Sequence, residues 1–177
     1  MKRDKARLLL GSRTLLGHVQ ALARGLGCGV RLIRRDLIPR CGPLGGVCTA
    51  LRTTNARQVL FLACDMPFVT VALLRQVGRT LRSGAPAAFV HCRGVAGFPF
   101  ALRPAMLPVV EALLAERQVS LQRLARRLRA RRVTLRRAEA DQLFNINTPS
   151  DWARARAYWR RKRRLSAVGT NGMVVTC

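Results

Sequence analysis

Aromatic residues, histidine and paired cysteines are all scarce in this chain of 177 residues. Aromatic residues make up 5% of it, too few for the usual platform on which RNA bases stack. The two histidines, His18 and His91, are isolated, and no two cysteines form a Cys-x-x-Cys pair, so the ligand spacing of a structural zinc site is missing. His91 and Cys92 are adjacent, but on a strand they would point to opposite faces.

Long apolar runs are missing as well. No stretch approaches the roughly 18 uninterrupted apolar residues of a membrane-spanning helix, and the N-terminus lacks the apolar core of a secretory signal. We therefore expect a cytoplasmic protein. The length suits one domain with a substantial core, which we assign to residues 1–165. The segment 166–177 has no amphipathic pattern, and we expect a disordered tail there.

Acidic residues are also scarce. The chain has 8 of them against 33 basic residues, which gives a formal net charge of +25. Lys2, Lys5 and Lys162 are the only lysines, so arginine dominates, concentrated at 123–137 and 154–164. A bias in the nucleotide composition of the coding sequence would also enrich arginine. A field this positive raises the encounter rate with nucleoside triphosphates and nucleic acid alike, so we expect non-specific affinity for polyanions.

Helical and strand patterns alternate along the whole chain. This alternation predicts an α/β fold with a mostly parallel sheet, whose strands are connected by crossover helices. Apolar residues at helical spacing behind a cap or a proline predict helices at 15–26, 43–51, 71–81, 104–113 and 121–128, and from 149 onward. Apolar and β-branched runs predict strands at 30–34, 58–63, 87–91, 98–102 and 133–135.

The predicted strand at 58–63 is the most informative segment. It is short and apolar enough to be fully buried, and Asp65 follows its carboxyl end, shortly before a proline. In open α/β sheets ligands bind beyond the carboxyl ends of the strands, where a carboxylate can hold Mg²⁺ against phosphate oxygens. A single aspartate after a strand caps the next turn at least as often, so this residue alone leaves both interpretations open.

Three further features are candidate ligand contacts. The segment Gly42–Gly46 begins a predicted helix, whose free N–H groups favour a phosphate, a carboxylate or a base carbonyl. The alternative is purely conformational, because Gly-Pro pairs are common where a loop leads into a helix. Asn145 and Asn147 alternate, so on an extended segment they point to one side, although Asn147 could simply organise the turn into the next helix. Lys5 is either a compact ammonium for a phosphate or a solvated terminal lysine.

Taken together, four motifs resemble the molybdenum cofactor guanylyltransferase family, in the order and approximate spacing found there. The resemblance runs from residue 1 to about residue 160. It implies a three-layer, Rossmann-like α/β fold of the nucleotide-diphospho-sugar-transferase type. The motifs are Arg3-Asp4-Lys5-Ala6, Asp36 with Gly42-Pro43-Leu44-Gly45-Gly46, Ala63-Cys64-Asp65-Met66-Pro67-Phe68, and Asn145-Ile146-Asn147-Thr148-Pro149.

The resemblance also implies roles for individual residues. Lys5 and Asp65 are the implied catalytic residues, since Lys5 would meet the nucleotide phosphates and Asp65 would hold Mg²⁺. Asn145 and Asn147 would lie near the second substrate. The nucleotide pocket would be lined by Asp36, Gly42, Pro43, Leu44 and Gly46, together with Lys5 and Asp65.

The implied reaction transfers GMP from GTP to the terminal phosphate of molybdopterin and releases pyrophosphate. The implied partners are therefore GTP and a molybdopterin-type substrate, together with a molybdoenzyme or another protein of cofactor biosynthesis. Phe98 stands before Pro99 where the family often has a polar residue, which weakens the inference about contacts with the second substrate.

The chain departs from the family pattern at its start. The family begins with a strand and a glycine-rich loop directly ahead of the Asp-Lys pair, whereas here Met1 stands where the methionine of that motif would fall, and Lys2 where its last glycine would fall. Either the working protein is longer than the chain as given, or this is a shortened relative without catalysis. We favour the first, because removing a central strand leaves unpaired backbone groups and an exposed apolar edge.

Two other functions stay open. The net charge, the basic helix pattern around 121–132 and the cluster 160–164 would suit a basic nucleic-acid-binding or adaptor protein on a degenerate transferase scaffold, although charge runs are usually solvated faces. A cytidylyltransferase or a sugar-phosphate nucleotidyltransferase would keep the enzyme class and change the substrate.

Overall fold

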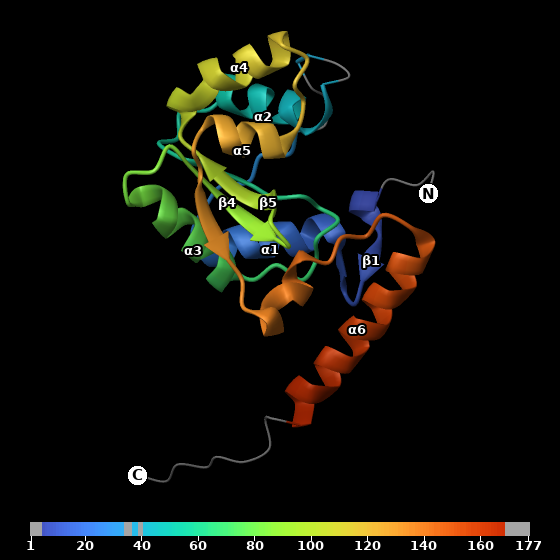
Figure 1. Ribbon diagram of the computed structural model, residues 1–177. Coiled ribbons are helices and arrows are strands. Elements are labelled where there is room, and N and C mark those ends of the chain that lie inside the picture. The colour runs from blue at the N-terminus through green and yellow to red at the C-terminus, as the bar shows by residue number, and fades with distance from the viewer. Residues whose placement is uncertain (1–4, 34–36, 39–40, 169–177) are drawn as a thin grey trace.

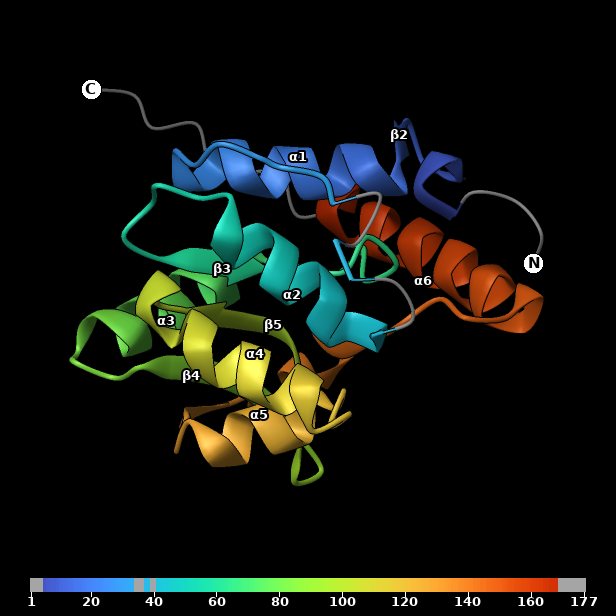
Figure 2. The same cartoon turned by 90° about the horizontal axis from the view of Figure 1, so that it is seen from above.

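A computed structural model describes residues 5–33, 37–38 and 41–168, with side chains up to Arg163. Three layers form the body of the molecule (Figure 1, Figure 2). A central sheet lies between three helices on one face and two on the other. The three are α2 (Gly42–Arg52), α4 (Leu107–Ala115) and α5 (Leu121–Arg127), and the two are α1 (Leu15–Leu26) and α3 (Val71–Arg82). A long helix, α6 (Pro149–Val168), runs along one side and projects beyond these layers. The predicted α/β class is therefore confirmed.

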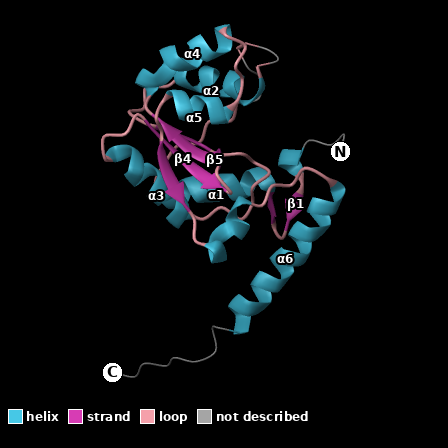
Figure 3. Ribbon diagram, in the orientation of Figure 1, coloured by secondary structure: helices cyan, strands magenta, loops and turns pink. Residues whose placement is uncertain are grey.

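The sheet has four strands within the described residues, in the spatial order β3, β5, β4, β6. Figure 3 shows β4 and β5 side by side in it. β3 and β4 each pair with β5 in antiparallel fashion, and β4 pairs with β6 in parallel. Three strands thus run in one direction and β5 runs against them, which makes the expected mostly parallel sheet a mixed one. The strands are β3 (Val59–Phe61), β4 (Ala87–Cys92), β5 (Val95–Leu102) and β6 (Arg131–Thr134).

The reversal of β5 comes from a tight turn that the strand patterns did not reveal. β4 and β5 are joined by Arg93 and Gly94, which both have positive φ angles, 50° and 81°. A two-residue turn with positive φ at both positions matches the twist of a hairpin, so β5 folds straight back along β4. The two predicted strands at 87–91 and 98–102 are confirmed, and they are direct neighbours.

Two helices begin at the hydroxyl caps that the sequence predicted, whereas the helix expected from Pro104 starts as a 3-10 turn and becomes α-helical only at Leu107. The Thr14 hydroxyl accepts a hydrogen bond from the Gly17 N–H at 2.9 Å, and the Thr70 hydroxyl accepts one from the Leu73 N–H at 3.2 Å. Gly27 ends the first helix in the left-handed conformation, at φ 69°. The helices are α1 (Leu15–Leu26), α2 (Gly42–Arg52), α3 (Val71–Arg82), α4 (Leu107–Ala115), α5 (Leu121–Arg127) and α6 (Pro149–Val168), with short 3-10 turns at Lys5–Arg7, Pro104–Met106 and Arg137–Leu143.

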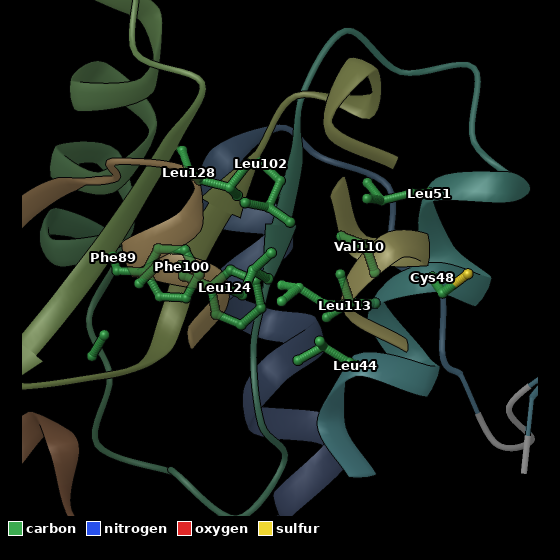
Figure 4. Close-up of a cluster of buried hydrophobic side chains, with 14 residues drawn as sticks. Leu44, Cys48, Leu51, Phe89, Phe100, Leu102, Val110, Leu113, Leu124 and Leu128 are labelled. Carbon is green, nitrogen blue, oxygen red and sulfur yellow. The ribbon is translucent and has the colours of Figure 1, made fainter. Parts of the chain in front are cut away.

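Two hydrophobic clusters hold the three layers together. Alternate side chains of β4 and β5 point to opposite faces. Phe89 and Phe100 therefore meet α2, α4 and α5 (Figure 4). Ala88, Val90 and Ala101 meet α3 on the other face. Phe89 and Phe100 are both 0% exposed and stack with ring centroids 4.4 Å apart. Burying one such ring contributes roughly 1.5–3 kcal/mol, so these pairs fix the sheet against the helices.

A third cluster fastens the N-terminal part of the chain to α6. A two-stranded hairpin, β1 (Leu9–Leu10) with β2 (Arg13–Thr14), precedes α1. The cluster joins this hairpin, the start of α1, the loop after Asp65 and the first half of α6. Its buried members are Leu10, Leu15, Phe68, Ile146 and Ala155.

Two strand predictions need correction. Residues 30–33 form no strand, and Arg34 lies outside the described residues. β3 is shorter than the predicted 58–63, and its side chains are half-buried rather than fully buried. Both differences have the same physical reason. β3 is an edge strand of the described sheet, and within the described residues no strand pairs with its outer side. The side chains of β3 are therefore only half-buried, and residues 30–33 have no neighbouring strand that would keep them extended.

The end of the chain departs from expectation in one respect. α6 continues to Val168, so residues 166–168, which we expected in a disordered tail, are helical, and residues 169–177 lie outside the described part. The assignment of the domain to residues 1–165 remains a prediction. None of the described helices is both long enough and apolar enough to cross a membrane.

Candidate active site

Three predicted site residues from distant parts of the sequence lie together. The Lys5 Nζ donates to the Ile146 carbonyl oxygen at 2.9 Å and to Asn147 Oδ1 at 3.2 Å. The same Nζ lies 3.9 Å from Asp65 Oδ2. The Ile146 N–H donates to the backbone oxygen of Asp65 at 2.9 Å, which ties the two segments to each other directly. Lys5, Asp65 and Asn147 therefore form one cluster, which we call the Lys5–Asp65 cluster.

The start of α6 holds Asn147 in place. The Asp151 carboxylate accepts hydrogen bonds from the N–H groups of Asn147 and Thr148, at 3.1 and 2.9 Å, and from the Thr148 hydroxyl at 2.9 Å. That hydroxyl in turn accepts from the Asp151 N–H at 3.0 Å. The hydrogen bonds, first those from Thr148 and then that from Asn147, lower the pKa of Asp151. The carboxylate thus stays charged and keeps the backbone around Asn147 in one conformation.

Asp65 combines partial burial with incomplete pairing. Burial raises the pKa of Asp65, and the nearby Lys5 ammonium lowers it only in part. The pair is partly solvated, with side chains 29% and 20% exposed, and at 3.9 Å it contributes less than about 1 kcal/mol. Asp65 Oδ1 is buried and has no hydrogen-bond partner within the described part of the chain. A buried carboxylate oxygen without a partner can accept a hydrogen bond from a ligand or coordinate a cation.

The donor set suits a hard cation only when a substrate helps to bind it. Among the described residues, no group of three or more His, Cys, Asp or Glu side chains could hold a metal ion. Mg²⁺ fits this arrangement, because it keeps several waters and is commonly bound by one or two carboxylates together with substrate phosphates. Asp65 would be its protein ligand here.

The other predicted site residues are more dispersed. Asn145 and Asn147 are both exposed and flank the buried Ile146, as their alternation predicts, but no described contact joins Asn145 to the cluster. The Leu44 side chain is 0% exposed and packs in the core, so any ligand contact from this position would come from the backbone. Gly42 begins α2 and faces Val119.

Pro43 occupies the first turn of α2, as predicted. The N-terminal N–H groups of α2 stay candidates for a ligand contact, although within the described residues no hydrogen bond or ion pair joins this turn to Lys5 or Asp65. Gly45 N is already engaged, because it donates to the Cys41 carbonyl oxygen at 3.3 Å. Gly46 is half-buried. Asp36 lies outside the described residues, so its predicted role stays a prediction.

Sequence reasoning missed two contributors to the cluster. One is the Ile146 carbonyl oxygen, which accepts from Lys5 and carries no side-chain signal. The other is Asp151, which holds the backbone at Asn147 and Thr148; its Thr-Pro-Ser-Asp motif predicted the start of a helix but not that this start would support the cluster. A capping motif directly after Asn-x-Asn was the only available clue.

The fold and the cluster are compatible with one class of protein. In open α/β sheets ligands bind beyond the carboxyl ends of the strands, and a carboxylate there can hold a divalent cation against phosphate oxygens. The chain belongs to the MobA-like NTP transferase domain family, whose family model matches residues 1–135. This finding confirms the family resemblance and its nucleotidyltransferase class.

Known proteins agree with this assignment. The molybdenum cofactor guanylyltransferase of Pseudomonas putida is 37% identical over 110 residues, or 61% of this chain. That match spans 56% of the relative, so the chain covers about half the length of this relative.

Two solved structures share the fold. The molybdopterin-guanine dinucleotide biosynthesis protein A of Archaeoglobus fulgidus superimposes with a TM-score of 0.65 at 18% identity, covering 90% of this chain and 92% of that one. The 2-C-methyl-D-erythritol 4-phosphate cytidylyltransferase of Thermus thermophilus superimposes with a TM-score of 0.65 at 19% identity, covering 88% and 93%. At these identities the likeness shows the fold alone.

Proposed function

We propose that the protein is a nucleotidyltransferase that transfers GMP from GTP to a molybdopterin-type acceptor and releases pyrophosphate. The observation that supports this most is the Lys5–Asp65 cluster, because it joins the two implied catalytic residues to the segment implied for the second substrate. The name of the Pseudomonas putida relative supports the guanylyl type.

In the reaction, an oxygen of the acceptor's terminal phosphate attacks the α-phosphorus of GTP, and the bond from that phosphorus to the bridging oxygen of pyrophosphate breaks. The protein needs to supply positioning and positive charge rather than a nucleophile. Mg²⁺, when bound, would neutralise charge on the phosphates. Asp65 would hold it through its carboxylate, one oxygen of which has no hydrogen-bond partner within the described residues.

Lys5 has a defined part in this arrangement. Two of its three N–H donors are used on the Ile146 carbonyl oxygen and on Asn147 Oδ1, which orient the ammonium. Within the described residues the third donor makes no hydrogen bond, with Asp65 Oδ2 3.9 Å away, so we assign it to a phosphate oxygen. Asn145 and Asn147 would contact the acceptor from the exposed side of their segment. Backbone N–H groups at the start of α2, near Gly42 and Pro43, would contact the nucleotide.

Isothermal titration of GTP in the presence of MgCl₂ tests this proposal. We would titrate the chain itself, and also a chimaera in which the N-terminal segment of the Pseudomonas putida relative precedes Arg3, since the family's glycine-rich loop is missing from this sequence. We expect binding that Asp65→Asn and Lys5→Met each weaken at least tenfold, while the exposed control Arg160→Met changes it less than twofold. If neither form binds GTP, or if Asp65→Asn binds equally well, the proposal is wrong.

A cytidylyltransferase is the second candidate, and the fold shared with the Thermus thermophilus enzyme favours it. The same titration with CTP discriminates between the two. We expect GTP to bind at least tenfold more tightly than CTP. The reverse order would assign the protein to the cytidylyl type.

Nucleic-acid binding is the third candidate, and the net charge of +25 motivates it. Binding to duplex DNA or RNA should fall steeply as salt rises from about 50 to 200 mM, because it rests on released counterions. Affinity for one sequence that survives physiological salt would instead favour a nucleic-acid-binding role.

A further inference from the structure

A hollow of about 380 Å³ lies between α1, α6 and the loop that leads into α3. Its volume falls within the range of small-molecule sites, roughly 300–1,000 Å³. Beside it, His18 of α1 meets Trp159 of α6 edge to face, and Figure 2 shows these two helices next to each other. Neither Lys5 nor Asp65 lines the hollow, so it is separate from the Lys5–Asp65 cluster. We call it the α1–α6 hollow.

The inner walls of the α1–α6 hollow are mostly apolar. Leu22 of α1, Val69 of the loop and the Trp159 ring of α6 line it together. Phe68 also lines it, and Phe68 and Val69 are 5% and 4% exposed, so little of either side chain reaches open solvent. An apolar side chain of a ligand leaves water when it enters such a space, which favours binding.

The mouth of the hollow is basic. Arg13, Lys162 and Arg163 line it and are exposed, and none of the described residues that line it is acidic. Arg13 and Arg163 make no hydrogen bond or ion pair within the described residues, so their N–H groups are available. A guanidinium group binds a carboxylate through two parallel N–H donors. The hollow therefore fits an anionic group at its mouth and an apolar group inside.

His18 adds a polar acceptor to the wall. Its side chain is 8% exposed, and its Nε2 lies 2.9 Å from the Leu10 carbonyl oxygen. A carbonyl oxygen only accepts hydrogen bonds, so Nε2 carries the proton, and Nδ1 of the neutral ring is an acceptor. Within the described residues Nδ1 makes no hydrogen bond, and it is not fully buried. It is therefore open to an N–H donor of a ligand in the hollow.

Together, these three features match the last residue of a polypeptide. In that residue one Cα carries a carboxylate, a side chain and an amide nitrogen. A simple carboxylic acid lacks the N–H donor. A free amino acid carries an ammonium group instead, which the three cations at the mouth would repel. A chain end with a large apolar side chain satisfies the mouth, the walls and His18 at once.

We propose that the α1–α6 hollow binds the C-terminal residue of a partner protein, and that this residue is large and apolar. Its carboxylate lies on Arg13 and Arg163. Its side chain packs between Leu22 and Trp159, and its amide N–H donates to His18 Nδ1. The net charge of +25 adds attraction for a partner that is acidic near its chain end. The proposal rests on the hollow and does not depend on the proposed transferase function.

Fluorescence anisotropy with the full chain at about 150 mM NaCl tests the proposal. The probe is a short, labelled serine–glycine peptide that ends in leucine with a free carboxylate. We expect its C-terminal amide, and the same peptide ending in glycine, each to bind at least fivefold more weakly, because one loses the anion and the other the apolar side chain. Equal binding of the acid and the amide, or of the leucine and glycine ends, would overturn the proposal.

Competing small acids distinguish a chain end from a simple carboxylic acid. N-acetyl-leucine has the carboxylate, the apolar group and the N–H, whereas 4-methylpentanoate lacks the N–H. We expect N-acetyl-leucine to displace the probe at concentrations at least threefold lower, because only this acid pairs with His18 Nδ1. If 4-methylpentanoate displaces the probe equally well, the hollow takes any apolar acid and the assignment to a chain end is wrong.

Matched charge variants separate this site from diffuse charge. Arg13→Gln with Arg163→Gln should weaken binding of the probe at least fivefold. Arg156→Gln with Arg160→Gln removes the same charge from exposed positions of α6 that do not line the hollow, and should change binding less than twofold. Equal losses in the two pairs would show that diffuse charge binds the peptide, and the proposal would fail.

A variant that fills the hollow gives a second test, in which no charge changes. Ala21 of α1 is half-buried and lines the hollow, so Ala21→Leu takes up space that the side chain of the ligand needs. We expect it to weaken binding of the probe at least fivefold, while Ala153→Leu, at an exposed position of α6, changes binding less than twofold. Circular dichroism confirms that both variants are folded. If Ala21→Leu binds the probe as tightly as the unmodified chain, the hollow is not the site.

Discussion

Asp65 is held between two opposing electrostatic effects. Burial favours its neutral form and raises its pKa, while the Lys5 ammonium at 3.9 Å favours the charged form, and burial has the larger effect. A charged group with one buried oxygen unpaired costs stability. Asp65 therefore suits a role in binding rather than in folding, because a cation or a donor from a ligand would satisfy that oxygen.

Asp65→Asn should separate stability from binding. At neutral pH the amide removes a partly buried charge, while Lys5 keeps its hydrogen bonds to Ile146 and Asn147. We expect the free energy of unfolding to rise by up to about 1 kcal/mol, or roughly 2–4 °C in Tm. Binding of GTP with Mg²⁺ should fall at least tenfold. Thermal unfolding and calorimetry measure the two effects, and a marked loss of Tm would contradict this account.

The pH dependence follows from the same raised pKa. Because the folded chain holds the Asp65 proton more tightly than the unfolded chain does, protonation of Asp65 stabilises the fold, and this contribution is lost as the pH rises through the folded pKa. Metal-dependent GTP binding has the opposite sign, since it needs the carboxylate and falls as the pH falls through that pKa.

Lys5→Met should move this acid limit to higher pH, because it removes the charge that lowers the pKa of Asp65. Titrations of Mg²⁺–GTP between about pH 4 and 8 would locate the midpoint. Arg160→Met is the matched control, since it removes one exposed positive charge elsewhere. A midpoint that moves to lower pH in Lys5→Met would show that Lys5 does not act on Asp65.

At the scale of elements, α6 depends on the N-terminal hairpin that it packs against. Gly11 lies in the turn between β1 and β2, at φ 68°, directly against the indole of Trp159. Trp159 also makes an edge-to-face contact with His18 of α1, with ring centroids 4.8 Å apart. The His18 ring is fixed in turn by a hydrogen bond between its Nε2 and the Leu10 carbonyl oxygen at 2.9 Å.

Gly11→Ala should therefore loosen this junction. The new Cβ would collide with the Trp159 indole, and the residue would keep a positive φ that alanine disfavours. We expect a loss of about 1–3 kcal/mol in the free energy of unfolding, measured by urea denaturation. Gly29→Ala is the control, because nothing lies within 4 Å of its added Cβ, and it should change stability by less than about 0.5 kcal/mol. Similar losses in both variants would contradict this packing.

Most helices and strands could be predicted from the sequence, and the wrong strand predictions share one cause. Caps and apolar spacing lie within a few residues of each other, so the helices after Thr14, Thr70 and Thr148 were found correctly. The edge position of β3 and the missing strand at 30–33 depend on which segments become neighbours, and no local pattern encodes that. The reversal at Arg93 and Gly94 lacked the Asn-Gly or Asp-Gly signature of such turns.

At the scale of the whole molecule, an aromatic stack crosses three neighbouring strands. Phe100 on β5 stacks on Phe89 of β4, with centroids 4.4 Å apart, and on Phe61 of β3, with centroids 4.7 Å apart. Phe89 and Phe100 are 0% exposed, whereas Phe61 is half-buried at the edge of the described sheet. The stack therefore links the edge of the sheet to its centre.

Phe100→Ala should cost about 3–5 kcal/mol, because it opens a cavity with neighbours on both faces. That is a large fraction of the roughly 5–15 kcal/mol that stabilises a typical domain. Phe61→Ala should cost clearly less, since solvent already reaches this ring. Guanidinium chloride unfolding of both variants measures the difference, and equal costs would contradict the edge position of β3.

The amino-acid sequence by itself determined the α/β class, the caps and apolar faces of the helices, and the residue types needed at a phosphate site, because each of these is a local or compositional property. The tertiary structure decided which of those residues meet. Lys5 and Ile146 lie 141 positions apart, and they touch only because Leu10, Leu15 and Phe68 pack with Ile146 in one cluster. Burial of apolar side chains from distant segments brings such groups together, and no pattern within a single segment contains that information.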